Sequence, residues 1–263
     1  MKPIADLKAY LPTTKKELQL RGWDEVDVII FSGDAYIDHP AFGAAVIGRV
    51  LEHAGYKVAI VPQPDWRGDH RDFTKLGRPR LFFAVTAGSM DSMVNHYTAA
   101  KRLRSDDAYT PEGKAGMRPD YCTITYCNIL RHLYPDTPIV IGGIEASMRR
   151  LTHYDYWSDK LMPSILVDSK ADLLVYGMGE KQILAVAERL DAVGNRIEAE
   201  RWKDLPQVAY LAKNNPAQHD TTATQPLHNT APQYTILHSH EEAVKSKRAH
   251  AENFRIIETE SNK

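Results

Sequence analysis

The chain contains only two cysteines, Cys122 and Cys127, among its 263 residues. Two cysteines cannot form the disulfide framework of a small secreted domain, and so few thiols favour the reducing cytoplasm. The first residues lack the apolar segment of a signal peptide, and no run of about 18 apolar residues occurs anywhere. We therefore expect a cytoplasmic protein with no membrane span.

An excess of charge of either sign is also missing, since 33 Lys and Arg residues stand against 34 Asp and Glu residues. Without a basic field, the chain gives no indication that it binds nucleic acid or an anionic membrane surface. The hydrophobic share of 43% and the charged share of 25% are ordinary for a globular protein, and they exclude wholesale disorder and a coiled coil.

Several motifs of well-known enzymes are absent. The sequence has no G-x-G-x-x-G dinucleotide fingerprint, no Walker A phosphate loop and no G-x-S-x-G nucleophile elbow. The sequence therefore gives no support for a conventional NAD or ATP site, or for a hydrolase with a G-x-S-x-G nucleophile. Cys122 and Cys127 fall in one predicted helix, where their spacing puts them about 140° apart, so we interpret them as buried, inert thiols.

Short apolar segments alternate with helical patterns through the first two-thirds of the chain. A strand over residues 26–31, a helix from Pro40 to Gly55 and a strand over 56–61 form one β-α-β unit, which indicates a parallel sheet. The same alternation predicts strands over 81–86, 138–141 and 172–176, and helices from Ser89 or Asp91 to about Leu103, over 121–134 and over 180–190. The sequence thus predicts an α/β fold, a Rossmann-like doubly wound parallel sheet.

The composition divides the chain into three parts. We expect residues 1–205 to form the Rossmann-like domain, residues 206–238 to form a polar linker, and residues 239–263 to form a charged helix. That helix has too little apolar surface to build a core alone. We therefore expect the chain to be incomplete and to lead toward a further domain.

Ligands of open α/β sheets bind beyond the carboxyl ends of the strands, which makes Asp34, Asp38 and His39 candidate ligand contacts. These residues lie between the first predicted strand and the start of a helix, whose N-terminus favours anions. The alternative is that Asp38 only caps this helix.

Two further groups carry candidate contacts. Gly142 and Gly143 end a predicted strand, and paired glycines let a backbone approach a cofactor or a neighbouring helix closely; Glu145 follows them. His153 and Asp155 lie in an aromatic-rich segment that suits acid–base chemistry, metal binding or an interdomain contact. No third metal ligand stands at a diagnostic spacing, so we predict no metal site.

Long strings of the sequence resemble the N-terminal part of YgiQ-type radical SAM proteins. They include GDAYIDHPAFG, VIGGIEASMRRLTHYDYWSD and ILVDSKADLLVYGMGE. The resemblance extends almost without gaps over residues 21–190, and a weaker resemblance continues over residues 234–259.

The resemblance implies a protein of two parts. The N-terminal part is similar to the cobalamin-binding-like Rossmann domain that precedes many radical SAM barrels. The later barrel holds a [4Fe–4S] cluster through a C-x-x-x-C-x-x-C motif and cleaves S-adenosylmethionine. The present chain has no such motif, so we assign it no catalytic residue, and we do not expect it to perform radical chemistry alone. The expected partner is the barrel, in cis or as a separate chain.

The same resemblance raises the question of cobalamin. One class of cobalamin domain ligates cobalt through the histidine of a D-x-H-x-x-G motif. Here Asp38 and His39 are adjacent, and Gly43 follows His39 by four positions, so the motif is absent. This argues against a histidine-ligated cobalamin and leaves binding without such a ligand open.

We interpret the chain as the N-terminal accessory domain of a radical SAM, [4Fe–4S] cluster-dependent enzyme of unknown substrate. Its own role would be to bind a cofactor or a portion of the substrate, an unknown small molecule, over the mouth of the barrel. One alternative is a non-catalytic docking module, in which the aromatic segment and the C-terminal helix form an interface. Another is an independent, flavodoxin-like binder of a small molecule. The candidate ligand contacts are Asp34, Asp38, His39, Gly142, Gly143, Glu145, His153 and Asp155.

Overall fold

The structure is a computed structural model that describes residues 9–193, 202–212 and 235–261. The chain divides into two compact units. The first, the sheet unit, comprises Met1–Leu151 and Ser164–Leu211, and the second, the hairpin unit, comprises Thr152–Pro163 and Ala212–Lys263. The predicted α/β fold lies in the sheet unit.

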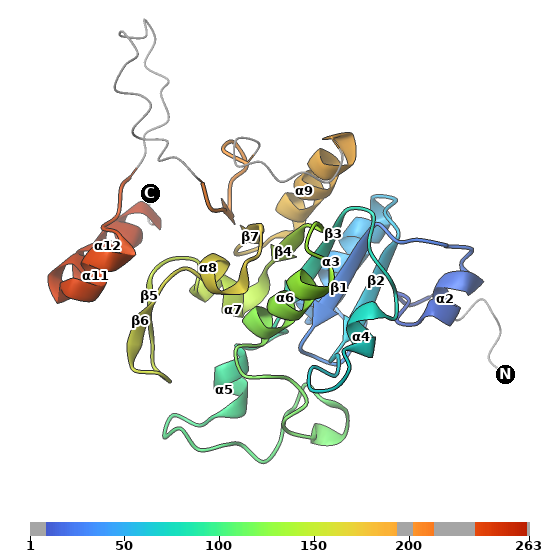
Figure 1. Ribbon diagram of the computed structural model, residues 1–263, viewed down its shortest axis with the longest axis horizontal. Helices are drawn as coiled ribbons and strands as arrows, with labels where there is room; N and C mark the ends of the chain where they lie inside the picture. Colours follow the sequence, from blue (N-terminus) through green and yellow to red (C-terminus); the bar gives the residue numbers. More distant parts are fainter. Residues whose placement is uncertain (1–8, 194–201, 213–234, 262–263) are drawn as a thin grey trace, which may run out of the picture. The chain divides into compact units, whose positions relative to one another are not determined.

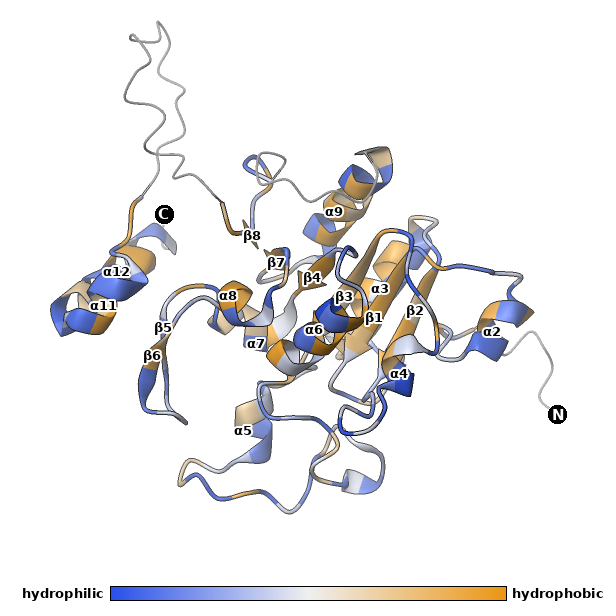
Figure 2. Ribbon diagram, viewed as in Figure 1, coloured by the Kyte–Doolittle hydropathy of each residue, from blue (hydrophilic) through white to orange (hydrophobic). Residues whose placement is uncertain are grey.

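A six-stranded sheet forms the centre of the sheet unit, with the strand order β2-β1-β3-β4-β7-β8 (Figure 1; β8 is labelled in Figure 2). The first five strands in this order are parallel, and β8 pairs antiparallel with β7 at one edge. Because β2 and β3 lie on opposite sides of β1, the sheet is doubly wound, and the predicted Rossmann-like architecture is confirmed. The strands are β1 (Val28–Ser32), β2 (Val58–Pro62), β3 (Phe82–Thr86), β4 (Ile139–Ile141), β7 (Leu173–Val175) and β8 (Val208–Ala209).

Alternate residues of each strand point to opposite faces of the sheet and pack in two different hydrophobic cores. In β1, Ile29 and Phe31 pack in one core with α6 (Cys122–Leu133), whereas Val28 and Ile30 pack in another with α3 (Gly43–His53) and α9 (Glu180–Val193). Both faces of the sheet are buried, so its strands are continuous apolar runs, drawn in orange in Figure 2. The shorter helices of this unit are α2 (Lys15–Leu20), α4 (Arg71–Thr74), α5 (Ser92–His96), α7 (Gly143–Met148) and α8 (Ile165–Ser169), with a 3-10 turn over Pro111–Gly113.

The start of α3 differs from the prediction. The helix begins at Gly43 rather than at Pro40, and its N-cap residue is Phe42, which provides no capping side chain. The alternative that Asp38 caps this helix is therefore wrong. The Asp38 carboxylate instead accepts hydrogen bonds from Arg49, which lies further along α3.

The limits of α5 are partly as predicted. Asp91 caps the helix, since its carboxylate accepts hydrogen bonds from the N–H groups of Met93 and Val94. The helix ends at His96, however, and not near Leu103. The reason is that the next residue, Tyr97, is extended and pairs with Leu103 in an antiparallel bridge.

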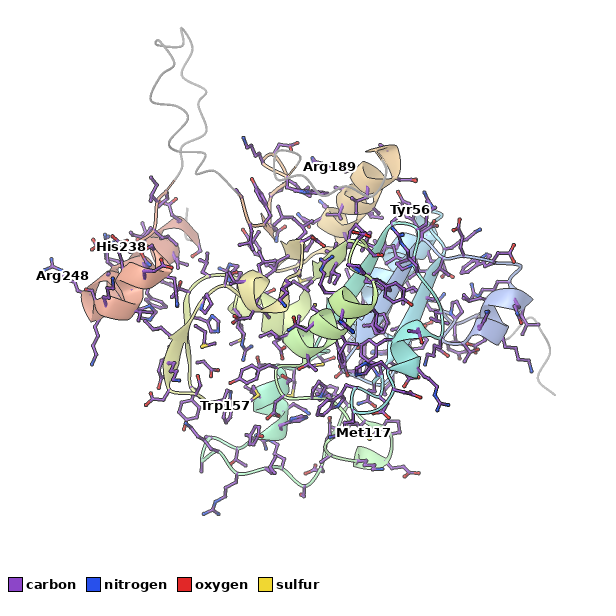
Figure 3. All side chains as sticks on the ribbon, viewed as in Figure 1. Tyr56, Met117, Trp157, Arg189, His238 and Arg248 are labelled. Atoms are coloured by element: carbon purple, nitrogen blue, oxygen red, sulfur yellow. The ribbon has the colours of Figure 1, made fainter. Side chains whose placement is uncertain are left out.

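Residues 202–209, which follow α9 in the described part of the chain, pack against the core of the sheet unit. Arg189, labelled in Figure 3, forms a bidentate ion pair with Asp204 in which both N–O distances are 2.9 Å. Its guanidinium also lies over the ring of Trp202, which is buried in the core that contains α3 and α9. These contacts position the chain for β8, which lies within the expected linker region.

The hairpin unit contains one element that the sequence pattern does not reveal and one that it reveals in part. β5 (His153–Asp155) and β6 (Lys160–Met162) form a short antiparallel hairpin. The predicted C-terminal helix is divided into α11 (His240–Lys245) and α12 (Lys247–Ser261), because Ser246 between them is extended. The rest of the expected linker, residues 213–234, lies outside the described residues.

None of the helices in the described ranges combines the length and the apolar character needed to cross a lipid bilayer.

Candidate functional site

A cavity of about 320 Å³ opens in the sheet unit at the carboxyl ends of β3 and β4. It lies between the N-terminal parts of α3 and α9, which cover the same face of the sheet. Its volume is within the range of about 300–1,000 Å³ that is typical of ligand pockets. Its position is the one at which open α/β sheets bind ligands. We call this cavity the groove.

The groove is mainly apolar. Ile30, Ala84, Val140 and Val175 contribute side chains from the sheet, and Ile47 contributes one from α3. Thr86 and Glu180 alone supply polar side chains among the described residues that line it. A surface with one carboxylate and no described histidine, lysine or cysteine suits the binding of a molecule better than acid–base or nucleophilic chemistry.

Glycines form much of the rest of the lining. The structure places two of the candidate contacts, Gly142 and Gly143, in the groove at the end of β4. Gly143 has a φ of 81°, and a Cβ atom there would lie 2.4 Å from Thr86 Oγ1, so no other residue fits without strain. The lining glycines are Gly43, Gly88, Gly142, Gly143, Gly177 and Gly179.

Asp34 belongs to a buried ion cluster. Arg118 Nη2 lies 2.9 Å from Asp34 Oδ1 and 3.1 Å from Asp107 Oδ2, and the Ser89 N–H donates to Asp34 over 2.6 Å. Burial raises the pKa of Asp34 and outweighs the opposing charge of Arg118. Arg118 also donates to the Ala87 carbonyl, so the cluster joins the long loop before α6 to the ends of β1 and β3.

The sequence pattern did not point to Asp107 or Arg118. Both lie in a polar loop in which solvated charges are the ordinary expectation. The predicted position of Asp34 at the end of a buried strand indicates that a positively charged partner is needed, because a buried carboxylate is costly without one. The partner itself could not be chosen among the many arginines.

Asp38 and His39 lie at the surface near the start of α3. Arg49 binds the Asp38 carboxylate and thereby holds the pKa of Asp38 below its ordinary value. His39 is exposed, and its Nδ1 atom accepts a hydrogen bond of 3.1 Å from the Ala41 N–H. Neither residue lines the groove, although their neighbours Pro40 and Ala41 do.

Glu145 points toward two helix starts. Its side chain is only 1% exposed. One carboxylate oxygen accepts a hydrogen bond of 2.8 Å from the Ser92 N–H, and the other accepts one of 2.9 Å from the Thr123 N–H. These donors lie in the first turns of α5 and α6, where backbone N–H groups lack partners within the helix. The geometry therefore makes Glu145 a structural link between three helices.

His153 and Asp155 both lie on β5, in the hairpin unit. Asp155 is buried, and its carboxylate accepts a hydrogen bond of 2.9 Å from the Ser158 N–H. This contact shapes the turn that leads from β5 to β6. The eight candidate residues are thus distributed over several places, and the groove contains two of them.

The two cysteines are buried in α6, with 0% of either side chain exposed. Burial raises the pKa of each thiol well above the ordinary pKa of a cysteine. The interpretation of these residues as inert thiols agrees with this environment. No group of three His, Cys, Asp or Glu side chains that could hold a metal occurs within the described segments.

Comparison with known proteins relates the whole fold to one family. The family model described as Radical SAM N-terminal matches residues 10–263. No solved structure matches the chain.

Individual relatives are similar over 80% or more of the chain. A UPF0313 protein of Bacteroides thetaiotaomicron is 58% identical over 98% of the chain, which covers 41% of that relative. A UPF0313 protein of Porphyromonas gingivalis is 56% identical over 99% of the chain, which covers 39% of it. One from Thermotoga neapolitana is 54% identical over 80% of the chain. The chain thus spans about two-fifths of the length of the first two relatives.

Proposed function

Because the chain belongs to the Radical SAM N-terminal family, we propose that it is the accessory domain of a radical SAM enzyme and that its groove binds a small molecule. The groove is the observation that carries this proposal, since it lies at the carboxyl ends of the strands and is lined by glycines and apolar side chains. We assign the substrate and the reaction to the complete protein rather than to this chain alone.

The proposed cofactors of the complete protein are a [4Fe–4S] cluster and S-adenosylmethionine. The cluster needs several thiolates that converge on one place. Cys122 and Cys127 do not fit it, because both thiols are buried and their raised pKa disfavours the thiolate. We therefore assign the cluster and the radical chemistry to a catalytic domain outside this chain, in cis or on a separate chain.

Cobalamin is a separate possibility for the groove. The described lining residues include no histidine, so they do not fit a cobalamin that is ligated through imidazole. Cobalamin bound without a histidine ligand is a ligand to titrate, together with flavin and S-adenosylmethionine.

The test compares this chain with a complete protein that also carries the catalytic domain. After anaerobic treatment with iron and sulfide, we expect cluster absorption and cleavage of S-adenosylmethionine in the complete protein and neither in this chain. A version of the complete protein with Ala84→Leu, which narrows the groove, should keep its cluster and bind more weakly whichever of cobalamin, flavin and S-adenosylmethionine the original protein binds. Formation of a cluster in the isolated chain would contradict the assignment of the cluster to a separate catalytic domain.

A second candidate function is docking. The hairpin unit exposes three large aromatic side chains, with Tyr154 52%, Tyr156 47% and Phe254 64% exposed. Such residues are enriched at protein interfaces. If the hairpin unit docks the catalytic domain, then Phe254→Asp should weaken the association between this chain and a separately expressed catalytic domain. Ligand binding in the groove should be unchanged.

We also propose a cytoplasmic location. The two cysteines are free thiols, which is the usual state in a reducing compartment. Localisation of a tagged complete protein by cell fractionation tests this proposal.

A further inference from the structure

The side chains of the sheet become smaller toward the groove. On the face that α3 and α9 cover, β3 presents Phe82, then Ala84 and then Thr86. On the same face, β4 presents Val140 and is followed by Gly142, which lines the groove. The floor of the groove therefore descends toward the backbone of the sheet at the carboxyl ends of these two strands.

Ala84 has the smallest side chain in a row of residues that crosses the sheet. Strand pairing places Ala84 between Ile30 of β1 and Val140 of β4. Ile60 of β2 and Leu173 of β7 continue the row on either side. Ala84 is 8% exposed, whereas none of the other four residues is more than 2% exposed. The groove therefore reaches the surface of the sheet at Ala84.

Polar groups that border this floor are already paired within the chain. The Thr86 hydroxyl accepts a hydrogen bond of 3.2 Å from the Gly88 N–H, and the Thr86 carbonyl accepts one of 3.0 Å from the Gly33 N–H. The Gly142 N–H donates to the Val85 carbonyl over 3.1 Å. A polar ligand group on this floor would lose its water without gaining a partner among these groups, which is costly. The floor therefore favours contact with a hydrocarbon surface.

Met178 adds an apolar surface at the mouth of the groove. It is among the residues that line the groove, and yet it is 76% exposed. A methionine side chain is flexible and polarizable, so it adapts to the shape of a bound molecule. A ligand that contacts Met178 would remove an exposed apolar side chain from water.

The volume of the groove indicates the size of the ligand. An apolar cavity of about 150 Å³ binds benzene, and the groove, at about 320 Å³, has roughly twice that volume. We propose that the groove binds the uncharged hydrocarbon part of a small molecule, about two fused rings in size, against the sheet at Ala84 and in contact with Met178. The side chain at position 84 then sets how deeply the ligand enters. The inference rests on the proposed ligand-binding function and specifies the class of ligand.

Three uncharged probes test the proposal on the full 263-residue chain. Indane is a hydrocarbon of two fused rings, benzene has one ring, and purine is similar in size to indane but carries nitrogen atoms in both rings. Shifts of the methyl NMR signals of Ile47 and Val140 report binding in the groove. We expect indane to bind there, benzene to bind about tenfold more weakly because it buries less apolar surface, and purine not to bind at the same concentrations.

A substitution at the floor tests the contact with the sheet. Ala84→Val should weaken indane binding about tenfold, because its two added methyl groups occupy space that the ligand needs, and it should weaken benzene binding less. Its melting temperature should stay close to that of the original chain, since the groove has room for the added groups. Ala59→Val is the matched control, because Ala59 is fully buried in β2 outside the groove lining. Overpacking there should lower the melting temperature, whereas the folded variant should bind indane as before.

A second pair of variants tests the mouth. Met178→Ser should weaken indane binding several-fold without a loss of thermal stability, because the side chain is exposed. Leu103→Ser is the matched control, since Leu103 is 72% exposed and is not among the residues that line the groove. It should leave indane binding unchanged.

Three results would overturn the proposal. Failure of indane to bind in the groove, or binding of purine as tight as that of indane, would contradict the hydrocarbon class. An unchanged affinity of Ala84→Val for indane would contradict the contact with the sheet. The ligand-binding function itself is judged separately, by titration of cobalamin, flavin and S-adenosylmethionine. Binding of one of these without binding of indane would overturn only the class of ligand.

Discussion

The guanidinium of Arg118 lies 2.9 Å from Asp34 Oδ1, and both side chains are buried at the carboxyl end of β1. Asp107 approaches the same guanidinium over 3.1 Å. One arginine thus compensates two buried carboxylates, one from the end of a strand and one from the loop that precedes α6. This arrangement is one of the contacts that hold the loop at the carboxyl ends of the strands, together with the hydrogen bond from the Ala35 N–H to the Tyr109 carbonyl.

Replacement of Arg118 by Met is expected to lower the free energy of unfolding by about 3–5 kcal/mol, because it leaves two buried carboxylates without their partner. Urea denaturation followed by circular dichroism measures the change. Arg71→Met is the matched control, since Arg71 pairs with Asp69 at the exposed surface, where such pairs contribute little to stability. Equal effects of the two substitutions would show that the Arg118 cluster does not stabilise the fold.

The pairing of Asp38 with Arg49 predicts a dependence of stability on pH. Hydrogen bonding to Arg49 lowers the pKa of Asp38 in the folded state. The stabilisation is therefore present above the pKa of the unfolded chain, and it is lost as the pH falls through the lower, folded pKa.

We expect Asp38→Asn to reduce the free energy of unfolding by about 0.5–1 kcal/mol at pH 7, as is usual for a partly exposed pair. The difference from the original chain should shrink as the pH falls below the ordinary aspartate pKa of about 3.9, and it should disappear once the pH is below the lower pKa of the folded state. Chemical denaturation at several pH values measures it. Asp136→Asn, at an exposed position, is the control and should show a smaller change. A difference that persists in acid would refute the electrostatic account.

The strands of the sheet could be predicted because both of their faces are buried. That arrangement produces apolar runs such as residues 28–31, which are recognisable without knowledge of the neighbouring strands. The hairpin of β5 and β6 could not be predicted in the same way. Its strands have three residues each and are mostly not buried, so no alternating pattern marks them.

The location of the candidate site could be predicted from the sequence, but most of the residues that line it could not. Gly142 and Gly143 reach the groove because backbone position at a strand end determines where they lie. For Asp34 and Glu145, position along the chain does not tell to which side the side chain points. Their partners Arg118, Ser92 and Thr123 are distant in sequence, and only the packed structure brings them together.

Glu145 and His39 should respond very differently to substitution. Glu145→Ala leaves two buried backbone N–H groups unpaired, each at a cost of about 1–3 kcal/mol. His39→Ala removes an exposed side chain, so its effect should stay within about 0.5 kcal/mol. Thermal melts of both variants, with Glu145→Gln as an intermediate that retains one acceptor, distinguish them. A Glu145→Ala chain as stable as the original would mean that this carboxylate is not the structural link described above.

The thiols of Cys122 and Cys127 should be protected from reagents for as long as the chain is folded. Both side chains are fully buried, and burial raises the pKa of each thiol, which disfavours the reactive thiolate. Labelling with an aromatic disulfide reagent should therefore proceed at the rate of unfolding in buffer and become rapid for both thiols in concentrated urea. A Glu188→Cys variant provides the comparison, because its added thiol lies at an exposed position of α9 and should react at once. Since α6 packs against the face of the sheet opposite α3 and α9, rapid labelling of the folded original chain would mean that this face opens readily, and the assignment of the two cysteines to the core would have to be abandoned.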